Sequence, residues 1–395
     1  MSVYKLFFRS LLVVICLLLI QSCHTSQTYE IKNAIDSLSR QWAPDSRESV
    51  AKIDFTTAKN SITLKGETDC SDLKNDLINV LGNKGYQIID SLMLLPPETL
   101  GNNIYGVVIL SVINMRTTPS HSSEMASQSL MGMPVKILKS AGSWYLIQTP
   151  DKYIAWTEKS SIQTMTSEDM EKWKNVKKLI CTDNSGWIYE TPEEKDVVGD
   201  FVAGCIMEDH GAFSSHQKVA LPDGRTGYIR NKTFESYSDW KNKSEPNGDE
   251  ILKSAVSIMG IPYSWGGTSS KGADCSGFVQ NVYFRNGIIL SRDASLQALH
   301  GFDVDISNGW NQLQKGDLLF FGSIRDSKPR VTHVAIYKDD GDYIHSSGRV
   351  MINSLDSTKS NYNELRTTSL LLAKRIIGYS SNNGIVAVKN HQLYN

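Results

Sequence analysis

Short hydrophobic segments separated by polar turns make up most of the 395-residue chain. In the first quarter, Ser61 to Gly66 alternates between apolar and polar positions, which predicts a strand. Leucine and valine then recur at helical spacing at positions 73, 77, 80 and 81, and Tyr86 to Asp90 is again typical of a strand. Residues 23–103 are therefore expected to contain a small α/β unit, and no chemical motif is evident in it.

Two later segments, residues 104–165 and 178–238, show several short strands with regular turn signals. In the first, strands are expected at Val107 to Arg116, Pro134 to Lys139, Trp144 to Gln148 and Ile154 to Thr157. In the second, weaker copy, they are expected near Gly186 to Tyr189, Gln217 to Leu221 and Gly227 to Ile229. Five or six short strands suit a small barrel, and the Gly142 to Tyr145 and Asp151 to Trp156 segments resemble the final hairpins of bacterial SH3-like barrels.

The segments between these units have their own signals. Met170, Trp173 and Val176 fall at helical spacing, which predicts a connecting helix over residues 166–177. Residues 239–249 are polar and contain proline and glycine, which is typical of a linker. A further domain is then expected over residues 250–380, followed by a tail at 381–395.

The first 22 residues have the pattern of an export signal. Lys5 and Arg9 precede an apolar run that ends before Gln21-Ser22-Cys23, and this run is too short to span a bilayer stably. A cysteine directly after such a run resembles a lipoprotein processing site, so Cys23 is expected to become the lipidated N-terminus of an exported, membrane-anchored protein. A plain signal peptide with an incidental cysteine is the alternative.

Composition narrows the class of protein. The chain carries 41 basic and 42 acidic residues, a formal charge of −1, so no basic excess points to nucleic acid. Its length predicts three or four units, and we expect a monomer. With Cys16 and Cys23 in the N-terminal signal and Cys275 in a motif considered below, only Cys70, Cys181 and Cys205 remain, and this odd number argues against a disulfide framework. Cys181 and Cys205 either pair or are small buried thiols.

The sequence Asp274-Cys275-Ser276-Gly277 places one cysteine at the start of an amphipathic helix that Asn286-Gly287 ends. Unpaired N–H groups of a first helical turn favour an anionic sulfur, so the pKa of the Cys275 thiol is expected to be lowered. Cys275 is therefore a candidate nucleophile, with an ordinary buried thiol as the alternative.

Two strands downstream each carry a histidine. Thr332 to Tyr337 and Asp342 to Ser346 flank the turn signal Asp339-Asp340-Gly341, which predicts a hairpin. His333 and His345 should then lie nearly opposite each other, one as the base and the other fixing its tautomer. The remaining histidines lack partners at metal-ligand spacing, so no metal or organic cofactor is expected.

These residues, with Gly316 to Phe321, resemble the motifs of NlpC-type cysteine peptidases over roughly residues 250 to 380. The resemblance implies a permuted papain-like fold, a bacterial cell-wall substrate and a catalytic set of Cys275, His333 and His345. The predicted fold class is α+β: a permuted papain-like peptidase domain preceded by two SH3-like barrels and a small N-terminal α/β unit.

Several other residues are candidates for substrate binding. The resemblance places Tyr263 and Trp265 in the active-site cleft, where Tyr263 would polarise the scissile carbonyl; core packing is the alternative. Asp274 either caps the helix or pairs with a substrate ammonium, and both are compatible if different oxygens are used. The Ser276 hydroxyl either binds substrate or satisfies a backbone donor.

The layout as a whole resembles the dipeptidyl-peptidase VI group. This resemblance implies cleavage between γ-linked D-glutamate and the diamino acid of stem peptides with a free N-terminal L-Ala, the first barrel closing one end of the cleft. It assigns amine recognition to Glu124 and Tyr153, which are otherwise a loop charge and a barrel-edge aromatic. The alternatives are an endopeptidase on intact peptidoglycan and a catalytically silent, lipid-anchored wall-binding protein.

Overall fold

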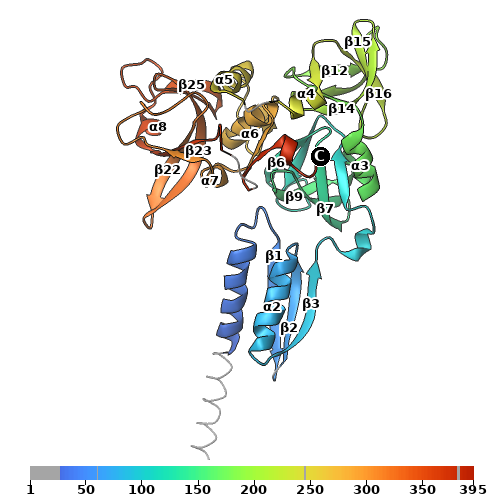
Figure 1. The fold of residues 1–395 in the computed structure, drawn as a ribbon, viewed down its shortest axis with the longest axis vertical. Helices are drawn as coiled ribbons and strands as arrows, with labels where there is room; N and C mark the ends of the chain where they lie inside the picture. Colours follow the sequence, from blue (N-terminus) through green and yellow to red (C-terminus); the bar gives the residue numbers. More distant parts are fainter. Residues whose placement is uncertain (1–26, 60, 244–245, 380–382) are drawn as a thin grey trace, which may run out of the picture. The chain divides into compact units, whose positions relative to one another are not determined.

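The structure, a computed structural model, describes residues 27–59, 61–243, 246–379 and 383–395 (Figure 1). The predicted signal peptide and Cys23 lie outside these residues. Within the described ranges, no helix is both long and apolar enough to cross a membrane. The chain divides into two compact units, Met1–Pro97 and Glu98–Asn395.

The first unit is a three-stranded sheet packed against two helices. Strand β1 (Ala51–Ala58) pairs antiparallel with β2 (Ser61–Thr68), and β2 pairs parallel with β3 (Gln87–Leu94). Helix α2 (Ser71–Asn83) connects β2 to β3, and residues 27–42 form a second helix. The predicted strand, helix and strand are present, whereas β1 and the helix over 27–42 were not expected.

Barrel 1 is a seven-stranded sheet with the order β10-β4-β7-β8-β9-β5-β6. Its strands are β4 (Tyr105–Val108), β5 (Val112–Arg116), β6 (Met125–Leu130), β7 (Pro134–Ala141), β8 (Trp144–Gln148), β9 (Ile154–Glu158) and β10 (Ile162–Met165). The single strand expected from Val107 to Arg116 is two strands, and β6 and β10 were not predicted.

Helix α3 (Ser167–Asn175) follows, and barrel 2 has the order β13-β12-β16-β15-β14-β11-β17. Its strands are β11 (Lys178–Cys181), β12 (Gly186–Tyr189), β13 (Val197–Phe201), β14 (Ile206–Phe213), β15 (His216–Ala220), β16 (Thr226–Arg230) and β17 (Phe234–Ser236). Cys181 and Cys205 are separate buried thiols.

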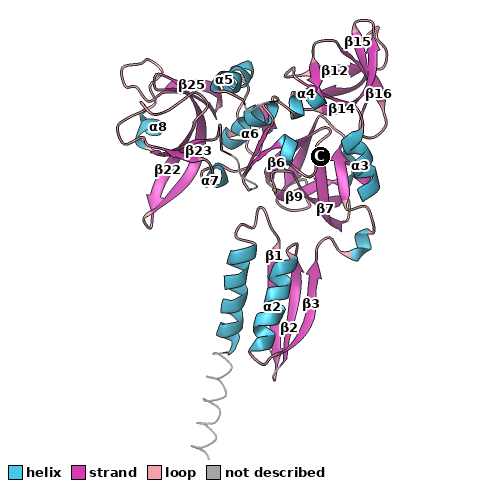
Figure 2. Cartoon of the chain, in the orientation of Figure 1, coloured by secondary structure: helices cyan, strands magenta, loops and turns pink. Residues whose placement is uncertain are grey.

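The last domain is built on a six-stranded antiparallel sheet with the order β21-β26-β22-β23-β24-β25. These strands are β21 (Phe302–Val304), β22 (Leu318–Arg325), β23 (Lys328–Asp339), β24 (Asp342–Ser347), β25 (Arg349–Ser354) and β26 (Leu370–Arg375). The helices are α5 (Gly248–Ser257), α6 (Cys275–Arg285), α7 (Ala294–Gln297) and α8 (Glu364–Thr368). Short strands β18 (Thr268–Ser269) and β19 (Gly272–Ala273) pair just before α6. Figure 2 shows how strongly strands dominate the chain.

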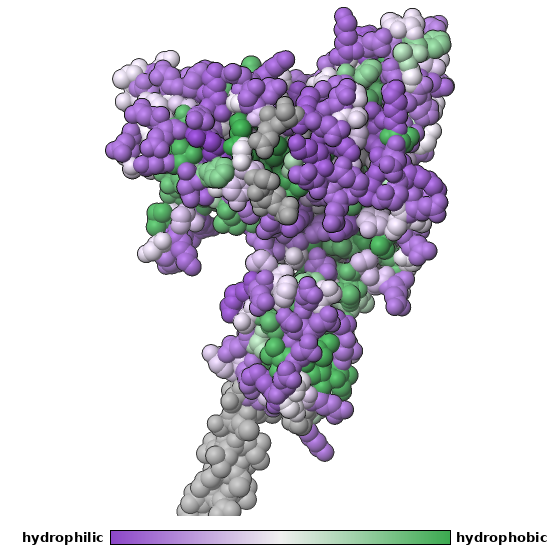
Figure 3. Space-filling model, viewed as in Figure 1, coloured by the Kyte–Doolittle hydropathy of each residue, from purple (hydrophilic) through white to green (hydrophobic). Residues whose placement is uncertain are grey.

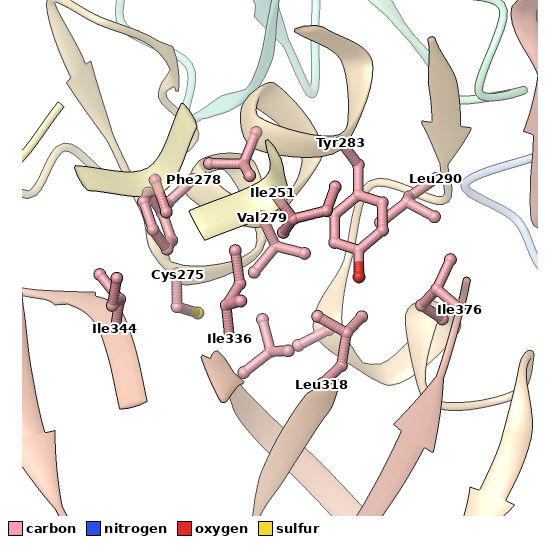
Figure 4. Packing of buried hydrophobic residues seen from close by; sticks show 14 of the residues in the cluster. Ile251, Cys275, Phe278, Val279, Tyr283, Leu290, Leu318, Ile336, Ile344 and Ile376 are labelled. Carbon is pink, nitrogen blue, oxygen red and sulfur yellow. The ribbon is translucent and has the colours of Figure 1, made fainter. Parts of the chain in front are cut away.

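Both faces of this sheet are buried. Val334 and Ile336 of β23 pack with Phe278 and Val279 of α6, as Figure 4 shows for part of this core. The alternate residues Ala335 and Tyr337 belong to a second hydrophobic cluster. The period of two that the sequence shows along β23 therefore separates two cores rather than a core and solvent.

Two connecting segments are more ordered than expected. The end of helix α4 (Tyr237–Lys241) and the start of α5 fall within the expected linker 239–249. The expected tail contains β27 (Ile385–Ala387), which pairs with β20 (Ile288–Leu290), and Tyr394 is buried. These segments were misjudged because their few apolar residues are stabilised by partners far away in the sequence. Where side chains reach the surface in view, polar residues dominate and apolar ones form small groups (Figure 3).

Candidate active site

The first turn of α6 holds Cys275 in a tightly built position. Asp274 caps the helix, because its Oδ1 accepts the N–H of Gly277 at 2.7 Å. Gly277 is required there, since a Cβ at this position would clash with the carbonyl of Gly267. Cys275 is only 8 % exposed and lies on the side of the helix that faces the sheet (Figure 4). The backbone of Val334, on β23, is close enough to act on the pKa of this thiol.

Arg292 is the partner that Asp274 needs. Its Nη2 contacts Asp274 Oδ2 at 2.6 Å and its Nη1 contacts Oδ1 at 3.1 Å, in a pair that is almost completely buried. Asp274 Oδ2 also accepts the N–H of Gly266 at 3.0 Å. Both oxygens are therefore already bonded, so the expected contact between Asp274 and a substrate ammonium does not fit this geometry, whereas its capping role does.

Ser276 belongs to the same network. Its hydroxyl accepts from Arg292 Nη1 at 3.0 Å and lies 3.3 Å from Asp274 Oδ1, and the residue is buried. Ser276 thus helps to hold Arg292 beside the helix N-terminus, and its hydroxyl is not directed to a backbone donor.

The two histidines meet through their ring nitrogens. His333 Nε2 lies 2.8 Å from His345 Nδ1, and the rings are 5.0 Å apart at an interplanar angle of 89°. The expected hairpin is present, but a bulge after Tyr337 shifts its register, so Ile336 pairs with Ile344. His345 then lies opposite Ala335 and not nearly opposite His333 as expected, and the two rings meet edge to face.

Asn353 on β25 fixes the protonation of both rings. Its Nδ2 donates to the carbonyl of Asn361, so its Oδ1 faces His345 Nε2 at 2.9 Å. His345 Nε2 must therefore carry the proton, and His345 Nδ1 accepts from His333 Nε2. This order leaves His333 Nδ1 unprotonated and available to take the proton of a thiol.

The electrostatics of these groups favour a neutral thiol and neutral imidazoles. Burial, and next the charge of Asp274, raise the pKa of Cys275, against the expectation that the helix terminus would lower it. Burial lowers the pKa of His333 well below its ordinary value and that of His345 to about 4. A thiol with this raised pKa would need a base to remove its proton before it could act as a nucleophile.

Tyr263 and Trp265 both lie at the site. Burial, and next the proximity of Cys275, raise the pKa of Tyr263 to about 12, so its phenol stays protonated and can donate a hydrogen bond. Trp265 is 63 % exposed, which excludes core packing for this residue. Its Nε1 donates to Glu124 Oε1 at 2.7 Å.

Barrel 1 meets the catalytic helix at this edge. Ser127 Oγ accepts from Arg292 Nε at 3.0 Å, and the side chain of Gln128 accepts the N–H of Thr268 at 3.0 Å. A Cβ at Gly266 would clash with the carbonyl of Met125, so the glycine permits this close approach. Tyr153 is buried in the core of barrel 1, and its phenol is close enough to influence Arg292.

Three residues of the site were not singled out in the sequence for these positions: Arg292 as the partner of Asp274, Asn353 as the partner of His345, and Arg366 on α8, which is close enough to lower the pKa of His333. Arg292 could have been found from the need to compensate Asp274. Asn353 lies on β25, the strand after that of His345, and no motif in the sequence distinguishes it from other strand residues. Within the described ranges, no group of three or more His, Cys, Asp or Glu is arranged to hold a metal ion.

Comparison with known proteins agrees with this geometry. Residues 260–369 match the NlpC/P60 family, and residues 115–162 match the bacterial dipeptidyl-peptidase SH3 domain. A gamma-D-glutamyl-L-lysine dipeptidyl-peptidase of Bacillus cereus is 30% identical over 58% of this chain and 68% of that protein. Dipeptidyl-peptidase 6 of Lysinibacillus sphaericus is 27% identical over 67% of this chain and 96% of that protein.

The fold is also found among solved structures. The crystal structure of an NlpC/P60 family protein from Bacillus cereus matches with a TM-score of 0.60 at 22% identity, covering 69% of this chain and 99% of that one. The match over residues 260–369 and the relative that is 30% identical over 68% of its length show that the chain belongs to the NlpC/P60 family of cysteine peptidases.

Proposed function

We propose that this protein hydrolyses the γ-D-glutamyl bond to the L-diamino acid in peptidoglycan stem peptides whose N-terminal L-Ala is free. His333 takes the thiol proton, Cys275 attacks the carbonyl, and His345 holds the base in its reactive tautomer. The backbone N–H of Cys275 and the Tyr263 phenol stabilise the oxyanion. His333 then protonates the leaving amine and activates water to release the enzyme.

The position of Glu124 is the observation that carries this choice of substrate. Its Oε1 is bonded to Trp265, while its Oε2 has no hydrogen-bond or ion-pair partner among the described residues. A carboxylate oxygen left open at the edge of the catalytic helix suits a free ammonium group. The relative at 30% identity is named for the gamma-D-glutamyl-L-lysine bond, which supports this choice, and the relative at 27% identity is named a dipeptidyl-peptidase.

The test is mass spectrometry of the products from L-Ala-γ-D-Glu-L-diamino acid tripeptides with free and acetylated amino termini. We expect release of L-Ala-γ-D-Glu from the free peptide and a loss of about a hundredfold or more in kcat/KM on acetylation. The Glu124→Gln variant should lose activity on the free peptide while the acetylated peptide is unaffected. Equal turnover of both peptides, or rapid digestion of intact sacculi with little tripeptide turnover, would contradict the proposal.

Cys275→Ala serves as the control for the nucleophile, because undiminished cleavage in that variant would reject the assigned chemistry. A wild-type protein that cleaves neither peptides nor sacculi would instead favour a wall-binding role.

We also propose that the protein is exported and held at a membrane by lipid on Cys23. The support is the sequence pattern of residues 1–23 alone. Radiolabelled fatty acid should be incorporated into the wild type and not into Cys23→Ala, and the variant should move from the membrane to the soluble fraction. Labelling of the variant would reject Cys23 as the acceptor.

A further inference from the structure

Arg366 is a guanidinium without an acidic partner at the catalytic histidines. Its side chain is half-buried, and no carboxylate among residues 27–59, 61–243, 246–379 and 383–395 forms an ion pair with it. Its Cζ lies 5.9 Å from the centre of the Phe321 ring, and that ring is 5.7 Å from the ring of His333. A charged group in such a place is normally paired, because partial burial without a partner is unfavourable.

The helix that carries Arg366 is joined to the hydrogen-bond network of His345 and Asn353. Asn363 caps α8, with its Oδ1 accepting the N–H of Arg366 at 3.1 Å. The Nδ2 of Asn363 lies 3.4 Å from Asn353 Oδ1, the same oxygen that accepts from His345. The short helix that carries the guanidinium is therefore joined to the histidines by its cap.

The other charges of the site lie elsewhere. Asp274, Arg292 and Glu124 gather at the N-terminus of α6, where barrel 1 contacts it. Arg366 instead belongs to the side of His333 and is close enough to lower the pKa of that imidazole. In cysteine peptidase chemistry the base must protonate the leaving nitrogen, so the leaving residue lies beside His333.

We propose that Arg366 binds the α-carboxylate of the leaving diamino acid. This inference rests on the proposed function and names the group that the site recognises on the leaving side. The carboxylate is two bonds from the nitrogen that His333 protonates, so one guanidinium beside His333 reaches it. Arginine suits this role because its planar N–H groups can grip both carboxylate oxygens. Peptides in which the diamino acid is the last residue are then preferred, since further residues convert that carboxylate into an amide.

The first test compares wild type and Arg366→Gln on three peptides: the free tripeptide, its C-terminal amide, and the form with the α-carboxylate of D-glutamate amidated. In the wild type the C-terminal amide should lower kcat/KM by about tenfold to a hundredfold. Arg366→Gln should lose a similar factor on the free tripeptide and no longer distinguish it from its C-terminal amide. Arg330→Gln, an exposed arginine of β23, gives the same charge change as a control.

Three outcomes of that test would overturn the inference. Equal losses on all three peptides would mean that Arg366 acts only through the histidines. If Arg366→Gln instead no longer distinguished the free tripeptide from the form amidated on D-glutamate, the guanidinium would lie on the D-glutamate side of the scissile bond. A wild type that ignores C-terminal amidation would leave no carboxylate for Arg366 to bind.

The second test does not depend on the substrate. Iodoacetate and iodoacetamide alkylate the same sulfur, but only iodoacetate carries a carboxylate. The ratio of their rate constants at Cys275 should fall about tenfold in Arg366→Gln, be restored in part by Arg366→Lys, and be unchanged in Arg330→Gln. An unchanged ratio in Arg366→Gln rejects the anion site. If the ratio falls while the wild type cleaves none of the peptides, the proposed function fails and the anion site beside Cys275 stands.

Discussion

Replacing Asn353 with leucine, which has a similar shape, should disable the catalytic base while leaving the cysteine intact. Asn353 Oδ1 accepts the His345 Nε2 proton at 2.9 Å in a buried setting. Without that acceptor, the proton of His345 is better placed on Nδ1, where it can donate to His333 Nε2 at 2.8 Å. The proton of His333 must then move to Nδ1, so that nitrogen loses the lone pair that would take the thiol proton.

The magnitude follows from the chemistry of this exchange. In the variant, the reactive tautomer leaves the buried N–H of His345 without an acceptor, which costs about 1–3 kcal/mol. The free energy needed to reach this tautomer alone lowers the rate by roughly tenfold to a hundredfold. A base that is held in the wrong tautomer has a larger effect, of up to about 10⁴ in kcat. We therefore expect kcat to fall between about 10²-fold and 10⁴-fold in Asn353→Leu, with KM changed little, because no substrate contact is removed.

The assay is steady-state cleavage of the tripeptide between pH 5 and 9 for Asn353→Leu, Asn353→Asp and a matched control, Asn281→Leu. Asn281 is also a buried asparagine, but it donates to the carbonyl of Thr268 and lies outside the histidine network. Asn353→Asp keeps an acceptor and adds a negative charge, so it should retain much of kcat while moving the acid limb of kcat/KM to higher pH. An Asn353→Leu variant with the kcat of the wild type, or one affected only in KM, would refute the tautomer assignment.

Three further outcomes are expected. Arg292→Met should lower the free energy of unfolding, measured by urea titration, by about 3–5 kcal/mol, because Asp274 is left buried and unpaired. The double variant Arg292→Met/Asp274→Asn should regain much of this stability. Equal losses in the single and double variants would contradict the pairing. Since the pKa of the Cys275 thiol is raised, its alkylation by iodoacetamide should accelerate continuously from pH 7 to pH 9, whereas a plateau at neutral pH would indicate a preformed thiolate. In the folded state the pKa of His345 is about 4, against an ordinary value of 6.5, because the fold favours the neutral ring. His345 therefore contributes up to about 3 kcal/mol to the free energy of unfolding above pH 6.5, and this contribution is lost as the pH falls toward 4. Thermal unfolding of His345→Asn should therefore depend less on pH over that range, and an unchanged dependence would count against it.

Local patterns in the sequence predicted the elements that carry the chemistry. The helix from Cys275 to Arg285 has the predicted start and end, because its cap, its apolar face and its stop signal are all encoded within a few residues. The hairpin of His333 and His345 was predicted for the same reason. Its register was not, because the bulge after Tyr337 depends on how the two strands pack in the sheet.

Features that depend on distant partners were missed. The pairing of β27 with β20 joins segments far apart in the chain. Strand β6 pairs with the preceding strand β5, but its mixture of polar and apolar residues gives only a weak pattern. The pKa of Cys275 was predicted in the wrong direction because the helix terminus is visible in the sequence, whereas the burial of the thiol, the largest cause of the raised pKa, is not. The roles of Asn353 and Arg366 depend on tertiary contacts in the same way.

The guanidinium of Arg292 ties the reacting helix to its neighbour. One N–H group is satisfied by Ser127 of barrel 1, while the others hold the carboxylate next to the nucleophile. Excising residues 250–395 would expose an N–H group that normally lies in the interior, and exchanging barrel 1 for an unrelated module would do the same. Ser127 and Arg292 are thus expected to vary together in evolution. A chimaera that joins this peptidase domain to another barrel would need a hydrogen-bond acceptor at the position of Ser127.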